Sequence, residues 1–326
     1  MNISDILHRL TRLRRLEKLA LFVLWLLVPI LLSSWDYGLH IAISVTLWAV
    51  LALGINLVNG QAGQLILGGA AWFAIGAYAS ALLMLFQGWS FWATLPVSFF
   101  LGALSGFLVG LPSIRVGGDY LGIVTLGFGE IARLILINWA SLTRGPMGLP
   151  GIPAPSVFGT ELSSKAAFFY LLTALLVGTW ILMNRLTVSK FGLQLLSLRE
   201  DARVAQALGV DIGRAKVTSF VISAAVIGLA GAFYGSYISF ISPDAFVFND
   251  SMLMLAMVIL GGMGSPGGSV LGAVILIVAP EALRFLGDWR IVLYGLLLTV
   301  MMVYRPSGLW GLERRPRNEI KLTVKR

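Results

Sequence analysis

The sequence contains no cysteine and only two histidines, His8 and His40. Without cysteine, the chain cannot form a disulfide framework, a thiolate zinc site, an iron–sulfur cluster or a thiol nucleophile. Two histidines are too few for a histidine cluster, so such a metal site is excluded as well. The chain also lacks a Gly-x-Ser-x-Gly elbow, a His-Glu-x-x-His motif, a catalytic pair of acids and a Walker phosphate loop. These absences argue against an enzyme and against ATP binding by this chain.

Charge is scarce as well. Charged residues make up 12% of the 326 residues, about half of what a soluble domain carries. Hydrophobic residues make up 58%, and the mean hydropathy is +0.88. This composition predicts an all-α, polytopic integral membrane protein. Since a span needs roughly 20 apolar residues, we expect about ten transmembrane helices, some short or broken, at residues 17–34, 39–58, 62–86, 91–112, 119–139, 166–184, 216–240, 251–264, 267–286 and 289–305.

The basic residues that are present gather in three hydrophilic segments. Five Lys or Arg lie in residues 1–18, six in 185–216 and seven in 305–326. Basic residues concentrate in the cytoplasmic loops of membrane proteins, and an even number of spans leaves both termini on one side. We therefore predict that both termini and the segment 185–216 are cytoplasmic. The same distribution argues against nucleic-acid binding.

The expected organisation is one transmembrane permease domain, 19–310, between a basic cytoplasmic leader, 1–18, and a basic cytoplasmic tail, 311–326. The apolar run Leu19–Leu32 is interpreted as a retained first helix, because no clear small-x-small cleavage site follows it. The only long loop expected on the far side is 140–165, where repeated Gly and Pro exclude a regular helix. Two interpretations of this loop stay open: a connector, or a rigid surface for an extracytoplasmic partner.

The segment 185–216 is the only long polar interruption in the middle of the chain. Leu198, Ala202, Ala205 and Gly209 follow one another at spacings of four, three and four, which predicts a short amphipathic helix over 198–209. Gly209 is placed to end this helix and Asp211 to cap the next one. A small surface helix between two membrane spans is a candidate docking element.

Two further features lie inside predicted spans. Glu130 and Arg133 are at i and i+3 in the fifth span, where they can pair on one helical face. They form either a structural pair or a gating network, and a proton relay is poorly supported. The glycine-rich stretches 60–69 and 261–268 predict broken helices, which membrane proteins tolerate where protein or water covers the backbone.

Four stretches together resemble the LivM-type permease subunit of branched-chain amino-acid ABC importers: Asn59–Tyr78, Gly117–Asn138, Leu198–Gly209 and Val258–Gly268. Arg305–Leu309 is similar to the family's closing Arg-Pro-x-Gly-Leu. The resemblance implies a complex in the bacterial inner (cytoplasmic) membrane with two ABC ATPase subunits, a second, LivH-like permease and an extracytoplasmic substrate-binding protein. ATP and Mg would be bound by the ATPases, with no cofactor on this chain.

By the same resemblance, the loop 185–216 is similar to the cytoplasmic coupling loop of ABC permeases. That loop is summarised as Glu-Ala-Ala, three residues, then Gly. Here Glu200-Asp201-Ala202 precedes Gly209 by a longer interval, so the element and its end carry over better than single contacts. The coupling residues implied are Arg199, Glu200, Asp201, Ala202, Ala205 and Gly209.

The function expected is translocation of branched-chain or related amino acids, delivered by a binding protein and driven by a separate ATPase. One alternative is a permease of the same family for urea, amides or aromatic acids. An alternative of another class is a stand-alone secondary transporter or channel. The sequence does not identify the residues that bind the substrate.

Overall fold

The computed structural model describes residues 24–32, 35–157, 160–162, 164–284 and 308–310, and the single residues 295, 299 and 304. The predicted leader 1–18, the tail 311–326 and most of the predicted span 289–305 lie outside the described residues. Residues 24–31 are helical, and they pack on the helix that begins at Lys165. In that contact the Trp25 indole donates to the Thr173 hydroxyl at 3.3 Å.

Seven helices among the described residues are long and apolar enough to cross a membrane. They are α2 (Asp36–Asn56) with its π-helical continuation η1 (Leu57–Gln61), α3 (Gly69–Gln87), α4 (Phe91–Ser113), α5 (Asp119–Asn138), α7 (Lys165–Val188), α10 (Ile212–Ile238), and η3 (Pro243–Ala245) with α11 (Phe248–Gly261). The apolar helix α12 (Pro266–Ala282) is shorter. The prediction of a polytopic helical membrane protein is confirmed, and the count of ten spans stays a prediction.

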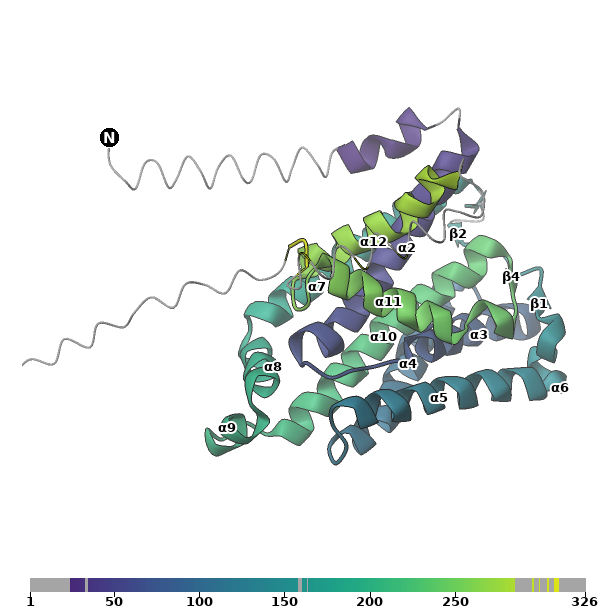
Figure 1. Cartoon of the computed structure of the whole chain (residues 1–326). Coiled ribbons are helices and arrows are strands. Elements are labelled where there is room, and N and C mark those ends of the chain that lie inside the picture. The colour runs from purple at the N-terminus through teal and green to yellow at the C-terminus, as the bar shows by residue number, and fades with distance from the viewer. Residues whose placement is uncertain are drawn as a thin grey trace, which may run out of the picture.

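Helix α10 crosses the middle of the bundle and packs most extensively on α4 and α3 (Figure 1). Small residues allow these approaches: a Cβ atom added to Gly102 of α4 would lie 2.5 Å from the Ala224 carbonyl oxygen of α10. Gly76 of α3 faces the Gly228 carbonyl of α10 in the same way. Because lipid is as apolar as a leucine side chain, membrane helices associate by such close packing rather than by hydrophobic burial.

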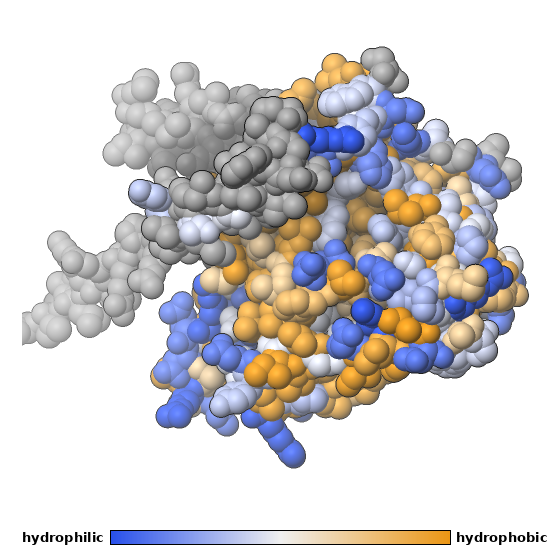
Figure 2. Space-filling view, turned by 45° about the vertical axis from the view of Figure 1, so that its right-hand side comes forward, coloured by the Kyte–Doolittle hydropathy of each residue, from blue (hydrophilic) through white to orange (hydrophobic). Residues whose placement is uncertain are grey.

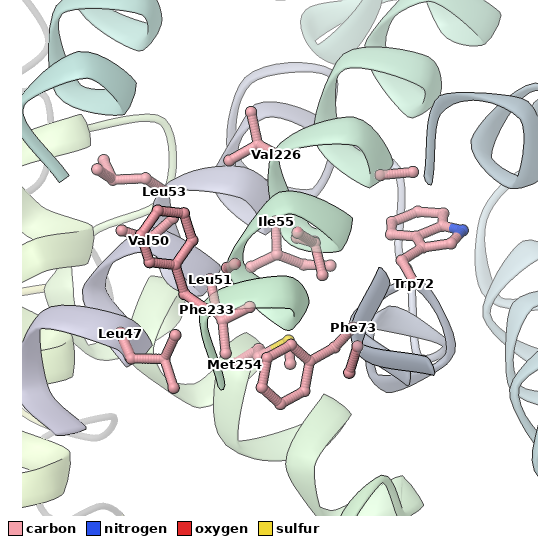
Figure 3. Packing of buried hydrophobic residues seen from close by; sticks show 14 of the residues in the cluster. Leu47, Val50, Leu51, Leu53, Ile55, Trp72, Phe73, Val226, Phe233 and Met254 are labelled. Carbon is pink, nitrogen blue, oxygen red and sulfur yellow. The ribbon is translucent and has the colours of Figure 1, made fainter. Parts of the chain in front are cut away.

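The core lies where α2, α3, α10 and α11 meet (Figure 3). Leu47, Val50 and Ile55 of α2 contribute to it, together with Phe233 of α10 and Met254 of α11. Many large hydrophobic side chains are also exposed, and Figure 2 shows hydrophobic patches interspersed with hydrophilic residues on one face. Apolar side chains both inside and outside are what a bilayer requires of its proteins.

Contacts between helix ends sort them into two groups at opposite ends of the bundle. At one end, Lys165 pairs with Asp36 at 3.3 Å and the Trp92 indole donates to the Ser156 carbonyl at 2.7 Å. At the other, Lys216 of α10 donates to the Ser113 carbonyl of α4 at 2.9 Å. These contacts place the starts of α2, α4 and α7 at the first end, and the end of α4 and the start of α10 at the other.

The loop 140–165 lies at the first of these ends. It contains α6 (Ala140–Thr143), the 3₁₀ turn η2 (Gly145–Met147) and the strands β1 (Leu149–Pro150), β2 (Ser156–Val157) and β3 (Thr160–Glu161). β1 pairs antiparallel with β4 (Phe240–Ile241), and β2 pairs with β3. Backbone hydrogen bonds from Gly151 and Ile152 to the Ser239 carbonyl fix the loop to the end of α10. As predicted, the described residues of the loop before α7 contain no helix longer than one turn.

Predicted span 62–86 is wrong at its start, because residues 62–68 are not helical and α3 begins at Gly69. The side chain of Asn59 forms a reciprocal pair of hydrogen bonds with the backbone of Ile66, 3.1 and 3.3 Å long. The Thr125 hydroxyl of α5 accepts from the Leu67 N–H at 3.0 Å. These side chains replace the intrahelical partners that a helix would supply, so an extended segment is satisfied inside the bundle.

Substitution of Gly76 by Val tests the close contact between α3 and α10. The added atoms have no space against the Gly228 backbone, so we expect a loss of about 1–3 kcal/mol of stability, measured as a lower unfolding temperature in detergent. Gly178→Val in α7 is the control, because a Cβ there meets nothing within 4 Å. Equal stability of the two variants would contradict the contact.

Candidate functional site

The polar segment between α7 and α10 forms two helices, α8 (Lys190–Glu200) and α9 (Ala202–Ala207). The prediction of one helix over 198–209 is therefore wrong. The chain is extended at Asp201, with φ −159° and ψ 111°. There the Asp201 carboxylate accepts hydrogen bonds from the Arg203 and Val204 N–H groups at 2.8 and 3.1 Å. Asp201 is thus the N-cap of α9. This cap divides the single helix that the periodicity predicted into α8 and α9.

Gly209 ends α9, as predicted. Its φ is +86°, the Gly209 N–H donates to the Gln206 carbonyl, and the Val210 N–H donates to the Ala205 carbonyl. This pair of bonds is a Schellman motif, which places glycine at the left-handed position. Asp211 caps α10, also as predicted, by accepting from the Arg214 N–H at 3.0 Å. The two-helix element, residues 190–207, therefore has defined beginnings and ends. We call it the α8–α9 element.

The α8–α9 element buries one face and exposes the other. Leu195, Leu198 and Ala205 are buried, Ala205 at 1% exposure, and Ala202 is half-buried. Ala205 therefore faces the protein itself. Val204 and Leu208 are exposed, at 55% and 77%, next to the exposed charges of Glu200 and Arg203. Large apolar side chains exposed on a polar segment are typical of an interaction surface. The sequence pattern did not reveal them, because a regular helix over 198–209 assigns different directions to these side chains.

Arg199, in the last turn of α8, is an exposed residue whose guanidinium turns back onto the end of the bundle. Its Nη1 donates to the Gly60 carbonyl in η1 at 2.7 Å and to the Met263 carbonyl after α11 at 3.4 Å. Its stem lies against Gly63, where an added Cβ would be 2.7 Å from the arginine Cγ. Hydrogen bonds from charged donors contribute roughly 1.5–3 kcal/mol. One side chain of the predicted coupling loop thus contacts both glycine-rich stretches.

The two glycine-rich stretches also contact one another. The Gly264 N–H donates to the Asn56 Oδ1 atom at 2.9 Å, and a Cβ on Gly60 would overlap both groups. The N–H groups of Leu309 and Trp310 donate to the Leu260 and Gly261 carbonyls at 2.9 and 2.8 Å. Parts of the stretches 59–78, 198–209 and 258–268 therefore meet residues 309–310 at one end of the bundle. Here we call this meeting point, formed by residues 56–63, Arg199, 260–264 and 308–310, the hub.

Glu130 and Arg133 of α5 form the predicted pair, with Arg133 Nε and Glu130 Oε2 3.9 Å apart. The glutamate side chain is 50% exposed and the arginine 26%, so the pair is not buried in the bundle. A Cβ added to Gly129 would lie 3.5 Å from the Gly68 Cα, whereas a Cβ added to Gly127 would meet nothing within 4 Å. Glu130 shares its helical face with the exposed residues Ile123 and Leu134. A carboxylate in the middle of such a face is expensive against lipid.

Replacing Asp201 with Ala tests the break between α8 and α9. Loss of an aspartate N-cap costs about 1 kcal/mol, so we expect the backbone amides of 202–207 to exchange hydrogen roughly fivefold faster. Asp201→Asn is the matched control, because asparagine caps equally well. Mass spectrometry of the purified protein in detergent gives the rates. Equal exchange in the two variants would show that the side chain does not cap α9.

The chain is similar to known transport proteins over most of its length. The family model described as "Branched-chain amino acid transport system / permease component" matches residues 38–304. The chain is 38% identical over 324 residues to the high-affinity branched-chain amino acid transport system permease protein LivM of Escherichia coli (strain K12), covering 92% of this chain and 76% of the relative. It is 27% identical over 286 residues to LivH of Salmonella typhimurium, covering 81% of this chain and 91% of the relative.

An archaeal relative is more distant. A probable branched-chain amino acid transport permease protein LivM of Methanocaldococcus jannaschii is 30% identical over 230 residues, which are 64% of this chain and 66% of the relative. No solved structure matches the chain significantly. The resemblance seen in the sequence is confirmed. With the family match over most of the chain and the LivM identity over nearly all of it, this chain belongs to the permease component family of branched-chain amino acid transport systems.

Proposed function

We propose that this chain is a permease subunit of an ATP-driven importer and translocates branched-chain or related amino acids that a binding protein delivers. The family supports the class of transport. The observation that carries the mechanism is the α8–α9 element, which lies between two membrane helices, is capped at each end, and exposes Val204 and Leu208 among charges. Such a surface suits a groove on a partner that undergoes a cycle of movement.

That partner is a pair of ABC ATPases, which bind ATP and Mg on their own chains. This chain has no Walker phosphate loop, so the energy has to enter through a contact with another chain. The second permease is a LivH-like subunit, in line with the similarity of this chain to both LivM and LivH proteins. On this proposal, closure of the ATPases pushes on the α8–α9 element, and the adjoining helices α7 and α10 transmit the push.

The α8–α9 end of the bundle is then the cytoplasmic one. It carries Arg115, Arg185, Lys190, Arg199 and Arg203, and basic residues favour the cytoplasmic side. With ten spans, both termini lie on this side, and the bacterial inner membrane is the location. At the opposite end, the loop 140–165 receives the binding protein. Its pairing with β4 and its backbone bonds to Ser239 hold it in one conformation, which suits a docking surface.

The exposed face of α5 faces the aqueous path between the two permeases in this proposal. Glu130 is half exposed at a depth where lipid disfavours charge. Helix α4 differs, because its exposed residues Phe100, Leu104 and Leu108 are all apolar, and we place this helix against lipid. A stand-alone secondary transporter would instead use Glu130 for ion coupling, and it would need no α8–α9 element.

Gly209→Val tests the coupling role of the α8–α9 element. A β-branched residue is strained at φ +86°, so the Schellman motif that ends α9 should be lost. In the transporter reconstituted in liposomes, we expect uptake to fall by about tenfold while the ATPases stay bound and hydrolyse ATP. Gly209→Asn is the control, because asparagine tolerates the left-handed conformation. Uptake at the wild-type rate in Gly209→Val would contradict the placement.

Single cysteines test the environment of α5, since the chain has none of its own. Glu130→Cys in the assembled transporter should react with a water-soluble maleimide at least about tenfold faster than Leu104→Cys on α4, because a thiol surrounded by lipid does not ionise. Labelling of this chain is followed by mass spectrometry. Equal, slow rates at both positions would place Glu130 in lipid or in a dry contact.

A further inference from the structure

Arg199 differs from the other charged residues of the α8–α9 element in where its charge lies. The Glu200 and Arg203 side chains extend from the exposed surface of the element. The Arg199 guanidinium instead donates to two backbone carbonyls, Gly60 at 2.7 Å and Met263 at 3.4 Å. These two carbonyls are distant in sequence, because one belongs to the segment after α2 and the other to the segment after α11. The side chain therefore joins three segments that are distant in sequence.

The site suits a cation for an electrostatic reason. Gly60 lies in η1, which ends the α2 helix, and Met263 lies just past the end of α11. The last carbonyls of a helix have no intrahelical partner and carry the negative end of the helix dipole. Arg199 brings a positive charge to the Gly60 carbonyl, at the end of η1, and to the Met263 carbonyl, two residues beyond α11. Both hydrogen bonds come from the single nitrogen Nη1, whose direction is fixed by the planar guanidinium.

Both segments that Arg199 contacts are places where the helical backbone is interrupted. Beyond Gln61 the chain is not helical until Gly69, and beyond Gly261 it is not helical until Pro266. Such interruptions change conformation with few bonds broken, because no continuous hydrogen-bond ladder runs through them. The Gln61 amide also donates to the Thr187 hydroxyl at the end of α7. Through Gln61 and Gly60, η1 is therefore attached to both α7 and α8.

We propose that Arg199 is a positioning residue that transmits the movement of the α8–α9 element to the breaks after α2 and α11. It would act from inside the subunit rather than as a contact to the ATPase. When the element is displaced, its guanidinium either carries both carbonyls with it or releases them, and in each case the two interrupted helices respond together. This inference rests on the proposed importer function and adds the residue through which that function crosses from the surface to the membrane helices.

The test uses the complete transporter, with its partner permease, ATPases and binding protein, in liposomes. Two quantities are measured: uptake of a branched-chain amino acid and ATP hydrolysis stimulated by the loaded binding protein. For Arg199→Ala we expect the uptake per ATP hydrolysed to fall by about tenfold, with the ATPases retained in the purified complex. Arg199→Lys should be intermediate, because a lysine keeps the charge but lacks the fixed planar geometry of the guanidinium.

Arg115→Gln is the matched control, since Arg115 is an exposed arginine at the same end of the bundle and lies outside the hub and the α8–α9 element. A second variant separates the proposal from a simple loss of charge. Gly63→Ala keeps the arginine and its charge, but the added Cβ would lie 2.7 Å from the Arg199 Cγ and has to displace that side chain. The alanine is also strained, because φ at position 63 is +64°. It should reproduce the Arg199→Ala defect, and the double variant should be no worse than either single one.

The outcomes distinguish this inference from the proposed function. If the wild-type chain binds no ATPase and shows no ATP-dependent uptake, the proposed function is wrong and this inference falls with it. If the wild type transports and the Arg199 variants keep its uptake per ATP, only this inference is wrong. Loss of the ATPases from the Arg199→Ala complex would also overturn it, since the arginine would then be a surface contact. Less assembled complex with an unchanged ratio would show a structural role alone.

Discussion

Backbone groups that leave a helix inside a membrane protein have to find partners within the protein, because the bilayer core offers none. In this chain the constraint falls on two stretches, residues 62–68 between η1 and α3 and residues 262–265 between α11 and α12. Each unsatisfied N–H or C=O would cost several kcal/mol. The partners are side chains of other helices: the Thr125 hydroxyl of α5 for Leu67, the Ser251 hydroxyl of α11 for Ala70, and the Asn56 amide oxygen for Gly264.

This solution links the breaks to the bundle. The hydrogen bond from Ala70 to Ser251 joins the start of α3 to α11, and the bond from Gly264 to Asn56 joins the end of α11 to α2. The two interruptions therefore cannot rearrange independently, because each is satisfied by the helix that leads into or follows the other. Residues 308–310 add a third segment to this arrangement, because the backbone N–H groups of Leu309 and Trp310 donate to the last carbonyls of α11. Movement at one break would therefore change hydrogen bonds at the other, through the Ala70–Ser251 and Gly264–Asn56 contacts.

Much of this architecture could be predicted from the sequence, and the misses have identifiable causes. Hydropathy located α4, α5 and α7 to within a few residues, because each is a continuous apolar run. It placed the start of α3 too early, since the same runs of Gly and apolar residues occur in the extended segment 62–68, and the deciding bonds come from Asn59 and Thr125. The caps at Gly209 and Asp211 followed from local chemistry. Asp201 was missed because an aspartate inside a helical pattern is read as a surface residue unless its cap is seen.

The candidate site shows a similar division. Sequence alone indicated the α8–α9 segment, the two glycine-rich stretches and Arg305–Leu309 as separate features. The convergence of the first three with residues 308–310 at the hub depends on long-range packing that no local pattern encodes. The resemblance to a coupling loop suggested that Arg199 faces a partner, whereas its guanidinium contacts Gly60 and Met263.

Glycine has two different roles at this end of the molecule, and they constrain function differently. At Gly209 a Cβ would meet nothing within 4 Å, and the residue is required by its positive φ alone. At Gly60 and Gly261 a Cβ would collide with backbone of the facing segment, and the residue is required by proximity. The first kind sets where a surface helix ends, and a residue that tolerates φ above zero can replace it.

The second kind holds two interrupted helices against each other without side chains between them. Contacts made by bare backbone have no rotamers to absorb a displacement, so a shift of one segment is passed to the other at nearly its full size. That is the property a transporter needs between the place where energy enters and the helices that open and close.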